Sequence, residues 1–117
     1  MRTIKFRGKS INKGEWFFGD LIHGNIGGYY ILPIEAENLY IGNKVIHETI
    51  GQYTGLQDKN GVEIYEGDIL HFSDGSQHVV MWDEYECGFN ILEYGIYLCE
   101  VIGNIYDNPE LLKEELL

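Results

Sequence analysis

Turn signals spaced about ten residues apart constrain the fold of this chain more than any other feature of its sequence. Between them lie short runs rich in Ile, Val and aromatic residues. In the first run Ile4 and Phe6 alternate with Lys5 and Arg7, which is the period-2 pattern of a strand with one buried face. A chain of 117 residues with 15 glycines and this pattern is expected to be mainly β, as one domain or as two small lobes.

The first half of the chain predicts an antiparallel β meander. Its third strand is ended by Pro33, which cannot continue a ladder of backbone hydrogen bonds. Gly19 lies inside the second strand and indicates a bulge or a close backbone approach. The stretch 35–43 is the least periodic and is expected to be a loop or an irregular edge. The strands predicted in this half are 4–7, 15–22 and 29–32.

The second half predicts a small barrel-like or SH3-like lobe followed by a short helix. Asp74 and Gly75 are expected to form the centre of a two-residue hairpin loop. Asn108 and Pro109 are typical of the N-cap and first position of a C-terminal helix of about eight residues. We therefore expect a single domain over 1–117, made of an N-terminal lobe over 1–50 and a C-terminal lobe over 51–117. The strands predicted in the second lobe are 69–72, 78–82, 88–92 and 99–106.

The net charge of −11, from eight basic and nineteen acidic residues, argues against direct binding to DNA or RNA, whose phosphates it would repel. The simplest role of this charge is to keep the protein in solution. A sharper alternative is mimicry of nucleic acid towards a basic partner. The acidic residues are dispersed along the chain, which weakens that alternative; Asp83, Glu84 and Glu86 form the densest group.

The sequence predicts a cytoplasmic protein with reduced cysteines. No charged leader followed by an apolar segment is found at the start, and no apolar run approaches the roughly twenty residues of a membrane span. Cys87 and Cys99 fit no metal-binding spacing and are expected to be free thiols.

Three blocks of the sequence resemble the YopX family of phage and prophage proteins. They are RTIKFRG at 2–8 with Trp16 and Gly19, IGQYTGLQDKNGVEIYEGDI at 50–69, and EVIGNIYDNPELL at 100–112. The resemblance implies a β-rich fold, a phage or prophage gene and a tendency to self-associate. It implies no biochemical activity and no catalytic residues.

His71 and His78 form the one candidate metal site. With Asp74 and Gly75 alone in the loop, the two histidines would lie directly opposite each other, with Cβ atoms about 4.5–5.5 Å apart. Two imidazoles at that distance could share a metal ion. No third ligand is evident nearby, and two histidines side by side on an outer sheet face are the simpler explanation of the pattern.

Two acidic positions favour structural roles over chemistry. The run from Asp58 to Gly61 predicts a turn and not a calcium loop, because the twelfth position holds Ile69 where calcium loops carry Glu. Asp68 is expected to bond to a turn, since no partner carboxylate or histidine has a spacing that would place it nearby.

Consecutive aromatic residues predict strands with apolar side chains on both faces. Trp16 and Phe18 must point away from Phe17, and Tyr29 away from Tyr30. Trp16, Phe18, Tyr29 and Tyr30 are therefore a candidate interaction surface, unless a two-sided core within the chain buries them.

The function expected from the sequence is that of a non-enzymatic phage accessory protein, a binding module without cofactors that forms homo-oligomers. The first alternative is an acidic inhibitor of a host nucleic-acid-binding or defence protein. The second is a small metal-dependent enzyme built around His71 and His78.

Overall fold

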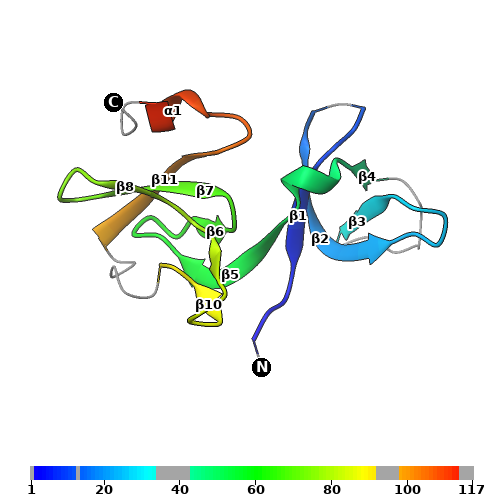
Figure 1. The fold of residues 1–117 in the computed structure, drawn as a ribbon, viewed down its shortest axis with the longest axis horizontal. Coiled ribbons are helices and arrows are strands. Elements are labelled where there is room, and N and C mark those ends of the chain that lie inside the picture. Colours follow the sequence, from blue (N-terminus) through cyan, green and yellow to red (C-terminus); the bar gives the residue numbers. More distant parts are fainter. Residues whose placement is uncertain (1, 13, 34–42, 92–97, 114–117) are drawn as a thin grey trace. The chain divides into compact units, whose positions relative to one another are not determined.

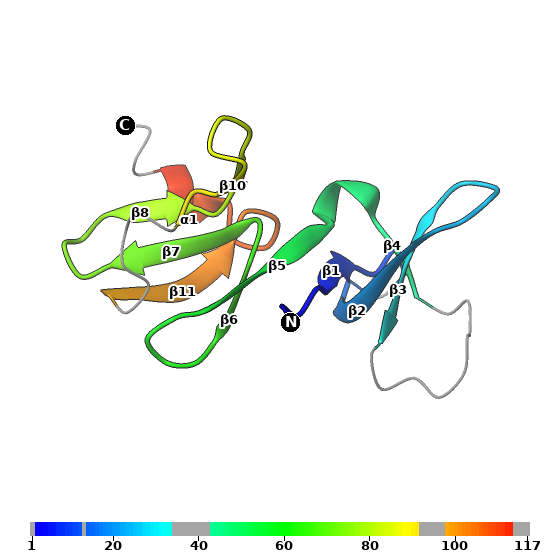
Figure 2. The same ribbon diagram turned by 90° about the horizontal axis from the view of Figure 1, so that it is seen from below.

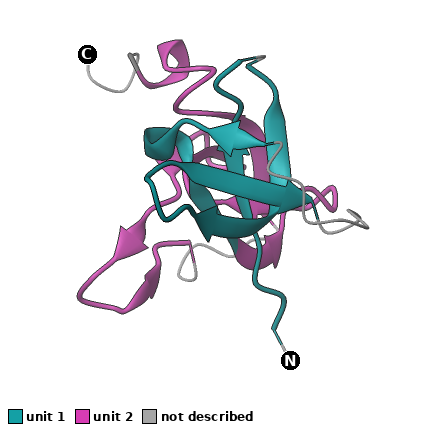
Figure 3. Ribbon diagram, turned by 90° about the vertical axis from the view of Figure 1, so that its right-hand side faces the viewer, with its two compact units in different colours: residues 1–53 teal, residues 54–117 magenta. Residues whose placement is uncertain are grey.

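A computed structural model describes residues 2–12, 14–33, 43–91 and 98–113 of the chain. Short strands dominate, with a 3₁₀ turn and one α-helix of four residues near the C-terminus (Figure 1), so the predicted mainly β fold with a short C-terminal helix is confirmed. The chain divides into two compact units, Met1–Tyr53 and Thr54–Leu117 (Figure 3). This division falls inside a strand, a few residues beyond the boundary expected at residue 50.

The first unit is an antiparallel meander with the strand order β4-β3-β2-β1, and the start of β5 pairs with the other edge of β1. The first three strands lie within about two residues of the predicted ranges, and β3 ends at Pro33. The bounds are β1 (Phe6–Lys9), β2 (Trp16–His23), β3 (Tyr29–Pro33), β4 (Lys44–Val45), η1 (His47–Thr49) and β5 (Gly51–Gln57).

The core of the first unit forms because the sheet curls onto itself at glycine positions. Ile31 and Val45 are buried, and a Cβ at Gly8 would lie 2.8 Å from the Cβ of Val45. Gly19 approaches the carbonyl of Leu32 so closely that no Cβ fits, which confirms the predicted close approach. Without a Cβ, Gly19 can approach the backbone of β3, and Gly8 leaves room for the Val45 side chain of β4.

The second unit contains a sheet of order β11-β7-β8, a separate two-stranded hairpin of β9 and β10, and β6 paired with the rest of β5 (Figure 2). Among the described residues these sheets do not close into a barrel, so the coarser expectation of a β-rich unit is the part that holds. The bounds are β6 (Glu63–Tyr65), β7 (Asp68–Phe72), β8 (Gln77–Val79), β9 (Trp82–Asp83), β10 (Gly88–Phe89), β11 (Cys99–Asn104) and α1 (Glu110–Lys113).

One continuous apolar cluster holds the second unit together. Its buried members come from β6, β7, β11 and the segments next to β8 and β10, so it joins elements that lie far apart in sequence. Burial of side chains of this size contributes about 1.5–3 kcal/mol each to folding. They are Ile64, Leu70, Phe72, Val80, Ile91 and Cys99.

The β7–β8 loop differs from the predicted two-residue turn. The Phe72 backbone N–H donates to the Ser76 carbonyl at 2.9 Å, so three residues, 73–75, form the loop. Gly75 has a φ of +91°, the left-handed position that ends such three-residue loops, and the Asp74 carboxylate accepts from the Ser76 N–H at 2.8 Å. An Asp-Gly pair suits both loop lengths, and here the longer one forms.

The C-terminal helix starts at Glu110, but its predicted side-chain cap is wrong. The Asn108 side-chain oxygen accepts from the Asn104 backbone N–H at 3.2 Å, while its backbone carbonyl accepts from Leu111 at 3.1 Å. Gly103 makes this possible, because any Cβ there would collide with Asn108. The end of the expected helix and nearly all of the expected loop 35–43 lie outside the described residues. No helix in the described parts of the chain is long and apolar enough to cross a membrane.

Candidate interaction surfaces

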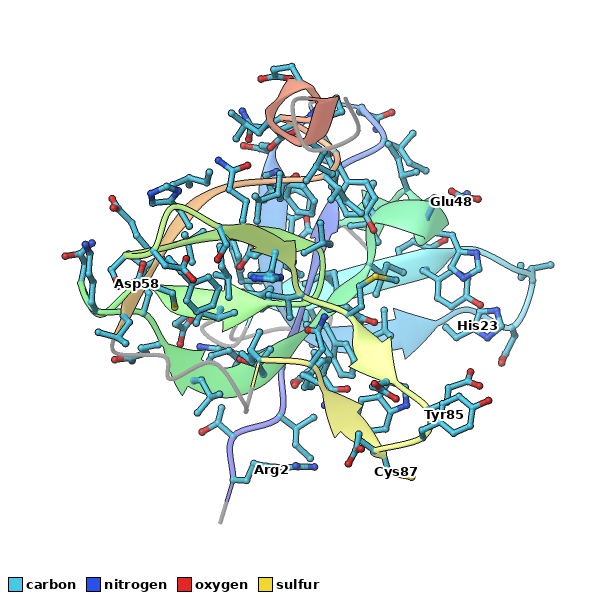
Figure 4. The ribbon with its side chains drawn as sticks, turned by 60° about the vertical axis from the view of Figure 1, so that its left-hand side comes forward. Arg2, His23, Glu48, Asp58, Tyr85 and Cys87 are labelled. Carbon is cyan, nitrogen blue, oxygen red and sulfur yellow. The ribbon has the colours of Figure 1, made fainter. Side chains whose placement is uncertain are left out.

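The hairpin of β9 and β10, residues 82–89, carries Tyr85, the most exposed large hydrophobic side chain among the described residues of the second unit. Tyr85 in its loop is 99% exposed, Trp82 on β9 is 48% exposed, and the preceding Met81 is 59% exposed. Figure 4 shows Tyr85 and Cys87 at the loop end of this hairpin. Tyrosine and tryptophan are the residue types that contribute most to protein–protein binding. We call residues 81–89 the acidic hairpin, because Asp83, Glu84 and Glu86 lie in it.

Hydrogen bonds fix the shape of the acidic hairpin at both ends. In the loop, one oxygen of Asp83 accepts from the backbone N–H groups of Tyr85 at 2.9 Å and Glu86 at 3.2 Å. At the base, the Asn90 side chain accepts from the Met81 N–H at 3.1 Å and donates to the Val79 carbonyl at 3.0 Å. Tyr85 is thus presented on an ordered loop, which lowers the entropic cost of binding.

Sequence reasoning placed Trp82 at the end of one predicted strand and Phe89 near the start of the next, and it singled out the acidic residues between them, but it did not identify the hairpin as an interaction surface. Trp82 pairs with Phe89 across the strands, with ring centroids 5.3 Å apart and planes at 85°. The available signal was this aromatic pair flanking a polar stretch that ends at Gly88.

The acidic charge is segregated between the two units, and the lobe boundary predicted at residue 50 gives the same division. Residues 1–53 contain six basic and five acidic residues, a net charge of +1. Residues 54–117 contain two basic and fourteen acidic residues, a net charge of −12. The negative charge of the protein therefore belongs to the second unit, the one that carries the acidic hairpin.

The aromatic residues predicted as an interaction surface fall on two faces of the first unit. Trp16 pairs with Lys9, Phe18 with Arg7, and Tyr30 with both Ile22 and Lys44, which places these three rings on one face of the sheet. Phe18 is 47% exposed on this face. Tyr29 pairs with His23 and lies on the opposite face, the one that carries buried Ile31.

Tyr29 forms the centre of a column of three stacked rings. Its ring lies 4.3 Å from that of His23, with planes 5° apart, and 4.3 Å from that of His47, with planes 12° apart. His23 is on β2 and labelled in Figure 4, and His47 is in η1. The column packs β2, β3 and η1 together. No sequence pattern indicated it, because its members come from three separate elements.

The structure does not bring His71 and His78 together. The longer β7–β8 loop shifts the register, so that His71 pairs with Gln77 and His78 pairs with Leu70. The two imidazoles then lie on opposite faces of the sheet, because side chains alternate along a strand. His78 instead contacts Phe72, with centroids 5.2 Å apart. The described residues contain no cluster of three or more His, Cys, Asp or Glu side chains able to hold a metal ion.

Asp58 and Asp68 have the structural roles expected of them. Asp58 closes the predicted turn, accepting backbone N–H groups from Asn60 at 2.8 Å and Val62 at 3.0 Å, and it also accepts from Val101 at 2.9 Å. Burial opposes ionisation of Asp58, but these hydrogen bonds outweigh it and hold its pKa below the usual value. Asp68 is buried and accepts from the Tyr65 N–H at 2.7 Å.

The two cysteines, both free as expected, differ in accessibility. Cys87 is exposed in the acidic hairpin, at a left-handed φ of 52°, and Cys99 is buried in the core of the second unit. Burial, and then the negative charge of Asp58, raises the pKa of the Cys99 thiol, so this group stays protonated and unreactive.

Comparison with known proteins identifies a family and a similar solved structure. The model of the YopX protein family matches residues 5–113. The crystal structure of protein EF1440 from Enterococcus faecalis is similar with a TM-score of 0.60 and 26% sequence identity, over 97% of this chain and 100% of that one. No curated protein matches the sequence.

Proposed function

The chain belongs to the YopX family, and on that premise we propose that it is a non-enzymatic, oligomeric binding module of a phage or prophage, acting in the cytoplasm of the bacterial host. It works by contact with other protein molecules, and no chemical step is assigned to it.

The observation that carries this proposal is the acidic hairpin with Tyr85 at its loop. A tyrosine that is 99% exposed contributes almost no burial to the folding of its own chain. Yet its loop is ordered by two hydrogen bonds to Asp83. With Trp82 and Met81 beside it, Tyr85 supplies the kind of apolar anchor that binds in a pocket of a partner.

The test is the mass of the assembly in solution, measured by size-exclusion chromatography with light scattering at micromolar concentration. We expect the measured mass of the wild type to be a whole multiple, twofold or higher, of the mass of one chain. Tyr85→Ser should shift it towards the monomer, whereas Ile26→Ser, which removes a fully exposed apolar side chain from a loop of the first unit, should not. A wild type that is strictly monomeric would count against the oligomeric part of the proposal.

The charge segregation favours a second candidate, an acidic inhibitor of a host nucleic-acid-binding or defence protein. Fourteen of the nineteen acidic residues lie in the second unit, against two basic ones. A surface of this sign fits a groove that normally binds phosphates, and it would attract a basic partner over a distance of about 10 Å at moderate salt.

This candidate is tested by capture from a host lysate with the immobilised protein. We expect a basic protein that is released by rising salt and by competing DNA, and that the Glu84→Lys/Glu86→Lys variant captures less well. If neither rising salt nor competing DNA releases the captured protein, the inhibitor function is excluded.

A further inference from the structure

One face of the first-unit sheet collects nearly all of that unit's described positive charge. Residues that pair directly across antiparallel strands point to the same side, and the pairs of this face join β1 to β2, β2 to β3 and β3 to β4. Asp20 is the one acidic side chain that the strands of the first unit place on it. We call this the basic face: Lys5, Arg7, Lys9, Trp16, Phe18, Asp20, Ile22, Tyr30, Leu32, Lys44 and Tyr53.

The basic face is also apolar and partly open to solvent. Phe18 is 47% exposed and Ile22 is 41% exposed, and both lie on β2. Cations lie over rings at two points, with Lys5 Nζ 4.9 Å from the Tyr53 ring centroid and the Arg7 guanidinium 4.8 Å from that of Trp16. A surface that mixes aromatic rings with positive charge fits a partner with the opposite charge and with rings of its own.

The acidic hairpin of the second unit has this complementary chemistry. It offers Trp82 and Tyr85 together with three acidic residues and no basic one. Two copies of the hairpin would repel each other because both are negative, so a symmetric contact of hairpin on hairpin is disfavoured.

We propose that the acidic hairpin of one copy docks on the basic face of a second copy of this chain. This inference rests on the proposed oligomeric function and names its interface. The contact joins two different surfaces. Reciprocated across a two-fold axis it closes an isologous dimer, and repeated head to tail it is heterologous and closes a ring. Tyr85 and Trp82 pack against Phe18 and Ile22, while the acidic residues of the hairpin lie near Lys9 and Lys44.

A strand of nucleic acid is the other occupant that basic and aromatic side chains could suggest, and the structure favours it less. Arg7 is only 7% exposed beneath the Trp16 ring, and Lys5 lies over the ring of Tyr53. Buried or ring-bound cations are poorly placed to neutralise phosphates. The second unit of the same chain, with a net charge of −12, would repel the nucleic acid as well.

Charge reversal on each side tests the contact, with sedimentation velocity as the readout and circular dichroism as the check of folding. We expect Glu84→Lys/Glu86→Lys and Lys9→Glu/Lys44→Glu each to weaken self-association about tenfold or more. Mixing the two variants should restore assembly, because reversed charges then meet across the interface. If Lys9→Glu/Lys44→Glu unfolds the first unit, the single variant Lys44→Glu, at an exposed position, replaces it in the test. Glu100→Lys/Glu110→Lys is the matched control in the same unit and should associate as the wild type does.

The outcomes separate the interface from the function. If the wild type assembles but both reversal variants assemble equally well, the docking inference is wrong and the oligomeric function stands. If the wild type is monomeric, the docking inference and the oligomeric part of the proposed function are both wrong. A fluorescent single-stranded oligonucleotide tests the other occupant. If it binds the wild type and does not bind the Lys44→Glu variant, the basic face binds nucleic acid and not a second copy of the chain.

Discussion

Replacing Asp58 by asparagine should destabilise the second unit. The carboxylate joins the turn at residues 58–61 to β11, because one oxygen accepts from Asn60 and Val62 and the other accepts from Val101, 43 positions along the chain. An asparagine oxygen can keep the two local hydrogen bonds. Its NH₂ group would then face the Val101 N–H, so that two donors meet.

The size of the effect follows from that geometry. A hydrogen bond to a charged group contributes about 1.5–3 kcal/mol, and an unsatisfied buried donor costs about 1–3 kcal/mol. Since Val101 is half-buried and water can reach part of it, we expect a loss of about 2–3 kcal/mol in the free energy of unfolding. For a unit of this size that corresponds to a fall of about 2 M in the urea midpoint.

Urea unfolding followed by fluorescence in a Trp16→Phe background measures this, because Trp82 is then the remaining tryptophan of the two and lies in the second unit. Asp74→Asn is the matched control and should shift the midpoint much less, since Asp74 is exposed and bonds only within its own loop. An Asp58→Asn midpoint within about 0.3 M of the wild type would refute the reasoning.

The pH dependence gives the same prediction a second measurement. The folded pKa of Asp58 lies below its unfolded value of about 3.9, so its contribution is fully present above that pH and is lost as the pH falls through the folded pKa. The difference in stability between the wild type and Asp58→Asn should therefore shrink below about pH 4. A difference that grows in acid would contradict the assigned hydrogen bonds.

Two further predictions concern packing and reactivity. Gly8→Ala should destabilise the first unit by about 1–3 kcal/mol, because the added Cβ would lie 2.8 Å from that of Val45; Trp16 fluorescence in a Trp82→Phe background measures the loss, and unchanged stability would show that the strands can separate at no cost. With a thiol reagent at pH 8, Cys87 should react in the native protein and Cys99 only on unfolding, since Cys99 is buried with a raised pKa; equal native rates, read by mass spectrometry, would disprove that burial.

Local patterns predicted those parts of the fold that depend on residues close in sequence. The alternation of Lys5 and Arg7 with Ile4 and Phe6 placed the cations of the first strand on one face, where the structure has them. The predicted 58–61 turn forms, and Gly61 in it has a left-handed φ of +81°. The separation of Tyr29 from Tyr30 follows from the period of a strand alone.

The candidate sites depended on information that a single local pattern does not contain. An Asp-Gly pair is compatible with loops of two or three residues, and the choice of three shifted His78 from His71 to Leu70 and removed the basis of the metal site. The exposure of Tyr85 is a property of the packed structure, since the residues around it read as an ordinary polar turn.

The sequence by itself determined the strand-rich composition, the turn positions, the family and the total charge of −11, because each of these follows from residue type and near-neighbour spacing. Only the tertiary structure decided which side chains from different strands share a face. Val101 reaches Asp58 across 43 positions, and the three rings of the His23–Tyr29–His47 column come from three elements. Such contacts form only after strands distant in sequence have paired. They depend on strand register and on the order of strands in the sheet, which no short stretch of sequence contains.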